Sequence, residues 1–123
     1  GGCFDAPLRR REGCGISREV GQGGQTAVTH WESLNVSATH SLLRVWLETG
    51  RTHQIRAHMQ HMGFPLEGDT MYGDAAQTMS RQALHCGRLW LEHPLTGEQI
   101  EVRSPLAPDM RVFVLGQGWN LPE

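Results

Sequence analysis

The spacing of apolar and polar positions predicts two neighbouring strands in the first half of the chain. Residues 26–34 are rich in β-branched and aromatic side chains, which is typical of a strand. In residues 41–48, aliphatic side chains alternate with arginine, tryptophan and glutamate, so this segment is expected to be a strand with one buried face. Because the link between the two segments is short, we expect them to pair antiparallel.

A helical pattern follows the second predicted strand. Ile55, Met59 and Met62 are spaced at i, i+4 and i+7, and this spacing places them on one face of a helix. We therefore predict a helix over residues 52–62, with Thr52 as its N-cap. The glycine directly after this pattern is expected to end the helix.

The rest of the chain predicts a loop, a hairpin and a closing helix. Residues 66–74 contain glycines and are expected to form a loop. Strands are predicted at residues 83–92 and 99–103, joined by a turn at 93–98. A short helix is expected at residues 109–115. Strands and helices thus mix along the chain, which indicates one α+β unit spanning residues 1–123 without an internal boundary.

The first segment, residues 1–25, is rich in glycine and arginine and shows no sustained periodicity. It is therefore expected to be a loop. Its basic run, Arg9-Arg10-Arg11, is expected to be a solvated part of that loop. Contact between this run and an RNA backbone is the alternative that remains open.

The composition narrows the class of protein. The chain has 123 residues, a formal charge of −2 and a pI of about 6.4, and this length suits one hydrophobic core. No stretch reaches the roughly 20 apolar residues of a membrane helix, and the first residues lack the apolar segment of a secretory signal. The near-neutral pI argues against a binder that depends on bulk positive charge. All 11 basic residues are arginines, which can contact phosphate, carboxylate or base edges bidentately.

Cysteines and histidines do not predict a metal site. The cysteines are odd in number and form no C-x-x-C pair, so they are expected to be free thiols in a reducing compartment. His53, His58 and His61 lack a carboxylate or cysteine at ligand spacing, and no H-E-x-x-H motif occurs. The sequence also lacks the G-x-S-x-G, P-loop and dinucleotide-binding motifs.

The segment with the highest density of candidate chemistry is residues 50–56, with the sequence GRTHQIR. It places two arginines, a histidine and a glutamine between a predicted strand and the start of a predicted helix. Backbone N–H groups and forked side chains at such a junction suit a phosphate or a carboxylate. A polar helix start is also commonly no more than a cap, and both interpretations stay open on the residues alone.

This segment resembles the signature block of the RluA-type pseudouridine synthases, which modify ribosomal and transfer RNA. The resemblance continues through a series of blocks in the order of that family. These blocks are residues 4–8, 47–59, 63–69, 71–73, 81–86, 93–98 and 104–110. A long ordered series of this kind is far more specific than any single short match.

The resemblance implies both a fold and a reaction. It implies an α+β fold with a mixed, largely antiparallel sheet, flanking helices and a cleft. Such enzymes isomerise uridine to pseudouridine in ribosomal or transfer RNA, with no metal and no cofactor. An aspartate acts as nucleophile, the glycosidic bond breaks, and C5 of the turned uracil joins the ribose. The target base has to leave its stack, so RNA is the expected partner.

The chain departs from the family pattern at the nucleophile. The family's nucleophile lies in an H-R-L-D motif and its catalytic tyrosine in a K-x-Y segment, and neither motif occurs in this sequence. The aspartates of this chain and Tyr72 match other family positions. We therefore expect residues 1–123 to be the C-terminal portion of a catalytic domain, inactive alone.

Arg56 is the residue to which the resemblance assigns a catalytic role. It matches the basic residue that pairs with the nucleophile, and in this chain it is expected to have lost that partner. An arginine beside an aspartate keeps the carboxylate ionised. We therefore expect Arg56→Ala in the full-length enzyme to lose most of its rate while folding normally.

The resemblance also predicts RNA-binding residues next to Arg56. Four of them are expected at the mouth of the cleft, near the flipped nucleotide or its phosphates: Arg51, Thr52, His53 and Gln54. Ile55 is expected to form an apolar wall beside the uracil. For His53 and Gln54, a bracing role inside the fold is an alternative of nearly equal weight.

Three further expectations concern the whole protein. A catalytically dead relative, kept as an RNA-binding or assembly module, is the alternative function. Cytoplasm, nucleus and organelle all remain open as the intracellular compartment. A truncated α+β chain exposes sheet edges and apolar surface, so self-association is expected to be possible.

Overall fold

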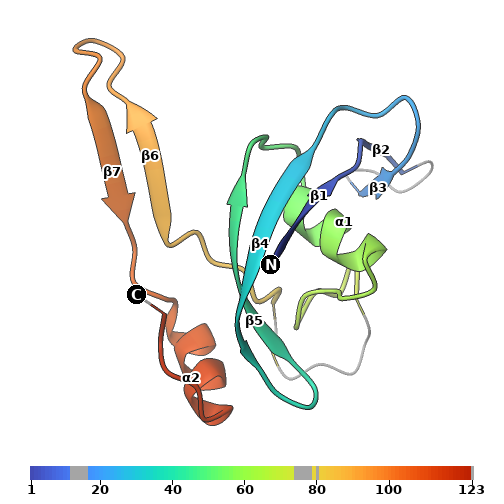
Figure 1. Cartoon of the computed structure of the whole chain (residues 1–123), viewed down its shortest axis with the longest axis vertical. Helices are drawn as coiled ribbons and strands as arrows, with labels where there is room; N and C mark the ends of the chain where they lie inside the picture. The colour runs from blue at the N-terminus through green and yellow to red at the C-terminus, as the bar shows by residue number, and fades with distance from the viewer. Residues whose placement is uncertain (12–16, 74–78, 80, 123) are drawn as a thin grey trace. The chain divides into compact units, whose positions relative to one another are not determined.

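The computed structural model describes residues 1–11, 17–73, 79 and 81–122. The chain divides into two units, Gly1–Ala83 and Leu84–Glu123 (Figure 1). The sequence predicted one unit, because its composition shows no linker between them. The candidate site lies entirely within the first unit.

The first unit is built on a three-stranded antiparallel sheet. Strand β4 (Val28–Val36) lies in the middle, between β1 (Gly2–Asp5) and β5 (Ser41–Leu47). The predicted strands near residues 26–34 and 41–48 are thus confirmed, as is their antiparallel pairing. The first segment was identified from its β-branched and aromatic side chains and the second from its alternation of apolar and polar residues.

The prediction of a loop over residues 1–25 is wrong for much of its described part. Besides β1, this segment contains β2 (Leu8–Arg10) and β3 (Arg18–Val20), which form a separate antiparallel pair. In β2, Leu8 is buried while the next two arginines are exposed. Strands of three residues are too short to show periodicity, and their stability comes from the partner strand. Residues 12–16 lie outside the described part.

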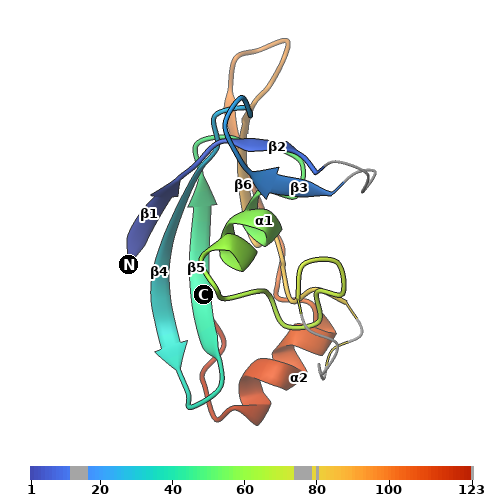
Figure 2. The same ribbon diagram turned by 90° about the vertical axis from the view of Figure 1, so that its right-hand side faces the viewer.

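The predicted helix is confirmed in its central part as α1 (Gln54–His61). Its C-terminal end has the expected glycine, Gly63, with a φ of 90°. The N–H of Phe64 donates to the carbonyl of Met59 at 2.9 Å, which closes a Schellman motif. Helix α1 packs against the sheet, with the β2–β3 pair beside it (Figure 2).

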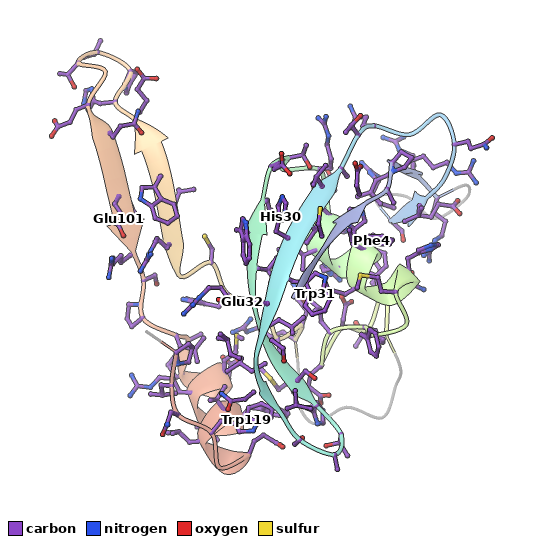
Figure 3. The ribbon with its side chains drawn as sticks, in the orientation of Figure 1. Phe4, His30, Trp31, Glu32, Glu101 and Trp119 are labelled. Carbon is purple, nitrogen blue, oxygen red and sulfur yellow. The ribbon has the colours of Figure 1, made fainter. Side chains whose placement is uncertain are left out.

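The face of α1 that enters the core is centred on polar as well as apolar residues. Met59 is buried as its spacing predicts, whereas Ile55 and Met62 stay partly exposed. His58 is fully buried, and its ring stands nearly perpendicular to that of Phe4, with 4.8 Å between the ring centroids. Phe4 belongs to strand β1 and is labelled in Figure 3. The spacing of hydrophobic residues alone misplaces this face, because it does not count His58 among the buried residues.

His58 links α1 to two other segments through both ring nitrogens. Its Nε2 lies 2.9 Å from the carbonyl oxygen of Ala6, and its Nδ1 lies 2.8 Å from the Thr29 hydroxyl. A carbonyl only accepts, so Nε2 carries the proton and Nδ1 accepts from Thr29. The neutral ring therefore satisfies both contacts.

Acidification is expected to weaken the first unit through His58. Burial lowers the pKa of this imidazole below its ordinary value of 6.5, against a smaller opposing effect of the Ala6 hydrogen bond. The unfolded chain then binds a proton at higher pH than the folded chain, so stability is full above the ordinary pKa and falls as the pH drops through it. Urea midpoints at about pH 7.5 and about pH 5.5 measure the effect.

The matched variants are His58→Gln and His85→Gln. The urea midpoint of His58→Gln is expected to depend less on pH than that of the wild type, because the buried titrating group is gone. The second removes a histidine of the second unit, whose Nε2 bonds the Ser104 carbonyl, and is expected to keep the wild-type dependence. A wild-type midpoint that stays constant over this range would contradict the prediction.

The second unit contains a hairpin and a helix. Strands β6 (Arg88–Glu92) and β7 (Gln99–Arg103) pair antiparallel, followed by α2 (Pro108–Gly116). The predicted hairpin and closing helix are confirmed, although β6 begins later than residue 83. The fold class is therefore α+β, and every strand pair among the described residues is antiparallel. Among the described residues of both units, no helix is long and apolar enough to cross a membrane.

Candidate functional site

The candidate site begins where α1 starts. Its N-cap is His53, in the left-handed region at a φ of 53°, so the prediction of Thr52 as N-cap is wrong. Thr52 is exposed, and the cap position shows no side-chain hydrogen bond to the helix end. The Gln54 N–H instead donates to the Arg51 carbonyl at 3.1 Å. A left-handed histidine is strained by about 1–3 kcal/mol, and such strain gathers at functional sites.

Gln54 lies inside the fold. Its side chain is 3% exposed, and its amide oxygen accepts from the Thr49 hydroxyl at 2.7 Å and from the Arg51 N–H at 3.0 Å. Its amide nitrogen donates to the Val28 carbonyl at 2.9 Å and to the Thr29 hydroxyl at 3.1 Å. These contacts favour the bracing role for Gln54, because the amide has no group left for RNA.

The other predicted contact residues remain reachable from solvent. Arg51 is partly exposed and uses its Nε to donate to the Thr26 carbonyl at 2.7 Å. Thr52 is exposed, and Ile55 is partly exposed. The structure thus separates the segment into a buried brace, Gln54, and neighbours that keep accessible groups.

Arg56 has a partner within the described chain that the sequence did not predict, and this partner is not the family's nucleophile. Its Nε and Nη2 donate to the two carboxylate oxygens of Asp69, each at 2.9 Å. The Asp69 side chain is 0% exposed and that of Arg56 is 13% exposed. A bidentate pair of this kind fixes the orientation of the guanidinium as well as its charge.

The surroundings keep both members of this pair charged. Burial alone would raise the pKa of Asp69, but the hydrogen bond from Arg56, the Tyr72 N–H, the charge of Arg56 and the Met71 N–H together hold that pKa below its usual value. The same hydrogen bond is the main cause that raises the pKa of Arg56. The site therefore contains a buried, fully ionised pair.

Tyr72 connects this pair to His53. Its hydroxyl accepts from the Arg18 N–H at 2.8 Å and lies 2.9 Å from Nδ1 of His53. The guanidinium carbons of Arg56 and Arg11 lie 5.1 and 5.6 Å from the centroid of its ring, which is within the range of a cation–π contact. Burial, then the charges of Arg56 and Arg18, lower the pKa of His53, so its ring is neutral at neutral pH.

Sequence reasoning missed several of these residues. Asp69 and Tyr72 matched family positions without a catalytic role, and Arg11 was assigned to a solvated loop. One signal was present: an aspartate directly after a glycine and three positions before a tyrosine suits a tight turn in which the carboxylate binds backbone N–H groups. That signal indicates a turn, but it does not identify the arginine that pairs with the carboxylate.

Metal ligands do not gather around this site. Across the residues that the structure describes, no group of three or more histidine, cysteine, aspartate or glutamate side chains could hold a metal ion. Cys3 and Cys86 are exposed free thiols, and Cys14 lies outside the described residues.

The fold and the site define a class: an α+β protein in which a buried carboxylate orients an arginine beside other basic groups. Residues 2–61 match the model of the RNA pseudouridylate synthase family. The chain belongs to this family and is of the RluA type. The prediction made from the ordered sequence blocks is thereby confirmed.

Among curated relatives, the chain is 44% identical over 116 residues to the RNA pseudouridine synthase YjbO of Bacillus subtilis, covering 94% of this chain and 41% of the relative. It is also 44% identical over 126 residues to the ribosomal large subunit pseudouridine synthase D of Pseudomonas aeruginosa, covering 89% and 38%. The chain therefore spans about two fifths of the length of these relatives.

Solved structures show the same fold. The human RNA pseudouridylate synthase domain containing 1 matches with a TM-score of 0.66 at 27% identity, over 88% of this chain and 50% of that one. The human RNA pseudouridylate synthase domain containing 4 matches with a TM-score of 0.69 at 21% identity, over 99% and 58%, and this likeness concerns the fold alone.

Proposed function

We propose that this chain is the C-terminal portion of a catalytic domain that isomerises uridine to pseudouridine in ribosomal or transfer RNA. The observation that carries the proposal is the oriented Arg56. Its Nε–Nη2 edge is held by Asp69, and Nη1 makes no hydrogen bond to any residue that the structure describes. An arginine held in this way has one edge left for a second anionic group.

That second group is the nucleophilic aspartate of the family's H-R-L-D motif, which this sequence lacks. Arg56 keeps that carboxylate ionised through its charge and a hydrogen bond. In the reaction, the bond between the ribose C1′ and N1 of uracil breaks, and a bond between C1′ and C5 forms. The hydrogen on C5 leaves as a proton, and N1 takes up a proton from solvent. Arg56 itself gives up no proton because its pKa is raised.

RNA is held, in this proposal, by accessible groups around the start of α1. Arg51, Thr52 and His53 contact the flipped nucleotide or its phosphates, and Ile55 lines the uracil. Gln54 braces this segment from inside. Specific RNA recognition relies on splayed bases and a small number of placed groups, so a near-neutral pI is compatible with it.

Self-association of this chain also belongs to the proposal. Large apolar side chains are exposed on the hairpin of the second unit, with Leu89 51%, Trp90 60% and Val102 48% exposed. Exposed apolar surface of this kind favours contacts with another copy or another segment.

Tritium release from RNA labelled at C5 of uridine tests the function. The full-length protein is expected to release tritium, because the C5 proton is lost in each turnover. The 123-residue chain is expected to release none, because its sequence lacks the H-R-L-D motif.

Turnover by this chain alone would contradict the assignment of the nucleophile. A full-length protein that binds RNA but releases no tritium would instead support the alternative function, an RNA-binding or assembly module. A filter-binding measurement on the same RNA separates these outcomes from a protein that does not bind.

A further inference from the structure

We propose that Asp69 is a positioning residue: it holds one edge of the Arg56 guanidinium so that the opposite N–H groups face a second carboxylate. This inference rests on the proposed function, because that carboxylate is the nucleophile. Asp69 itself does not react. It acts through Arg56, and it lies outside the set of residues that the sequence resemblance assigned to the site.

The hydrogen bonds of Arg56 divide the guanidinium into an occupied and an available edge. A guanidinium carries five N–H donors in a fixed plane. Asp69 takes the Nε–H and one N–H of Nη2. The remaining donors lie on Nη1 and on the far side of Nη2, and together they form the fork that matches a carboxylate. Fixing the first edge therefore fixes the direction of the second.

Asp69 is a suitable anchor because it is itself immobile. Its side chain is 0% exposed, and its Oδ1 also accepts from the N–H groups of Met71 at 3.2 Å and Tyr72 at 3.1 Å. Its own N–H donates to the Leu66 carbonyl at 3.2 Å. A buried carboxylate with both oxygens occupied is unsuited to attack a substrate, and it is suited to hold a cation in place.

A second restraint on Arg56 depends on the same carboxylate. The guanidinium carbon lies 5.1 Å from the centroid of the Tyr72 ring. The backbone of Tyr72 is in turn held by Oδ1 of Asp69. Asp69 is thus the in-plane partner of Arg56, and it also holds the backbone of Tyr72, whose ring lies against the guanidinium.

The local charge favours a second carboxylate over no ligand. Arg11 places another guanidinium 5.6 Å from the Tyr72 ring centroid, so two arginines and one aspartate make up this set of contacts. An added carboxylate would balance that excess. An RNA phosphate has the same charge and also offers two oxygens to a guanidinium fork, so the experiment has to separate the two.

The decisive variant is Asp69→Asn in the full-length protein. Asparagine keeps Oδ1 for the two backbone N–H groups, but it replaces Oδ2, the acceptor for Nε of Arg56, with an NH₂ donor. The turn is therefore retained, but the NH₂ group of the asparagine faces the Nε–H donor of Arg56 and cannot accept its hydrogen bond. The matched control is Glu67→Gln, which neutralises a carboxylate two positions away that pairs with His40 at 2.9 Å.

Asp69→Asn is expected to lower kcat by about 10- to 100-fold, the size of a positioning defect. KM and the RNA dissociation constant stay within about twofold, because the ground-state contacts are unchanged. The acid limb of the pH–rate profile moves to higher pH, since a displaced Arg56 holds the nucleophile ionised less well. Glu67→Gln is expected to match the wild type in all of these measurements.

Several results would overturn the proposal. A rate and pH profile equal to those of the wild type would show that Asp69 does not position Arg56. A loss confined to RNA affinity would identify the second anion as an RNA phosphate. If Asp69→Asn proves unfolded, Asp69→Glu makes the same test, because it keeps a carboxylate but displaces it by one methylene group from Arg56, and it must show the same pH shift.

Hydrogen exchange at Nε–H of Arg56, followed by NMR, tests the anchor independently of turnover. Exchange is expected to be slow in the wild type and about tenfold faster or more in Asp69→Asn. Equal exchange in both proteins would refute the positioning role even if the rate falls. If the wild-type protein releases no tritium, the proposed function fails, while exchange still decides whether Asp69 holds Arg56.

Discussion

Replacing Arg56 with alanine is expected to cost about 3–5 kcal/mol of unfolding free energy, beyond any loss of activity. The cause is Asp69, whose carboxylate is 0% exposed and would lose both hydrogen bonds from the Arg56 guanidinium. The expectation from sequence, that this variant folds normally, is therefore replaced. Urea denaturation of the 123-residue chain at neutral pH measures the change.

The matched control is Arg44→Ala. Arg44 pairs with Glu32 at 2.9 Å, the same distance as in the Arg56 pair, but its side chain is 49% exposed and that of Glu32 is 46% exposed. Exposed pairs contribute up to about 1 kcal/mol, so the control should lose far less stability. Equal losses in the two variants would contradict the prediction, because the Arg56 pair is buried and bidentate, whereas the Arg44 pair is exposed and rests on one hydrogen bond.

Acid should reduce the difference in unfolding free energy between the wild type and Arg56→Ala. The folded-state pKa of Asp69 lies below its ordinary value of 3.8. A lowered carboxyl pKa contributes stability above the unfolded pKa, and that contribution is lost as the pH falls through the folded pKa. The two unfolding curves are therefore expected to approach each other below about pH 3.8.

The family and the main strands could be predicted from the sequence because their signals are local or dense. Strands β4 and β5 are long enough for β-rich composition in the first and alternation in the second to show, and the blocks that resemble the family follow one another along almost the whole chain. Strand β1 could not be found in this way. Its four residues, GCFD, show no pattern, and pairing with β4 far along the chain makes it a strand.

Only part of the site was predicted, because contacts between distant residues leave no local signal in the sequence. Arg56 was identified from its motif, but its partner Asp69 lies 13 positions away on a loop. No periodicity connects a helix residue with a loop residue, so only the folded chain shows the pair. His53 is a similar case, since a left-handed N-cap without a glycine is stabilised by Tyr72, a tertiary contact.

Gly68→Ala is expected to destabilise the first unit by at least about 3 kcal/mol, because backbone strain and a steric clash add. Gly68 has a φ of 77°, and a Cβ at this position would overlap the Arg81 carbonyl oxygen and lie 2.7 Å from its carbonyl carbon. Both atoms belong to backbone, so a rotamer change cannot relieve the clash. Asp69 is the next residue, so a displaced loop would also separate it from Arg56.

Gly63→Ala separates the two causes. Gly63 has a φ of 90°, yet a Cβ there would meet nothing within 4 Å. It carries the strain of a left-handed residue, about 1–2 kcal/mol, without the clash. Urea unfolding should therefore rank wild type, Gly63→Ala and Gly68→Ala in falling order of stability. If Gly68→Ala loses no more than Gly63→Ala, the loop adapts to the added methyl group, and the rigid anchoring of Asp69 by its own loop would have to be abandoned.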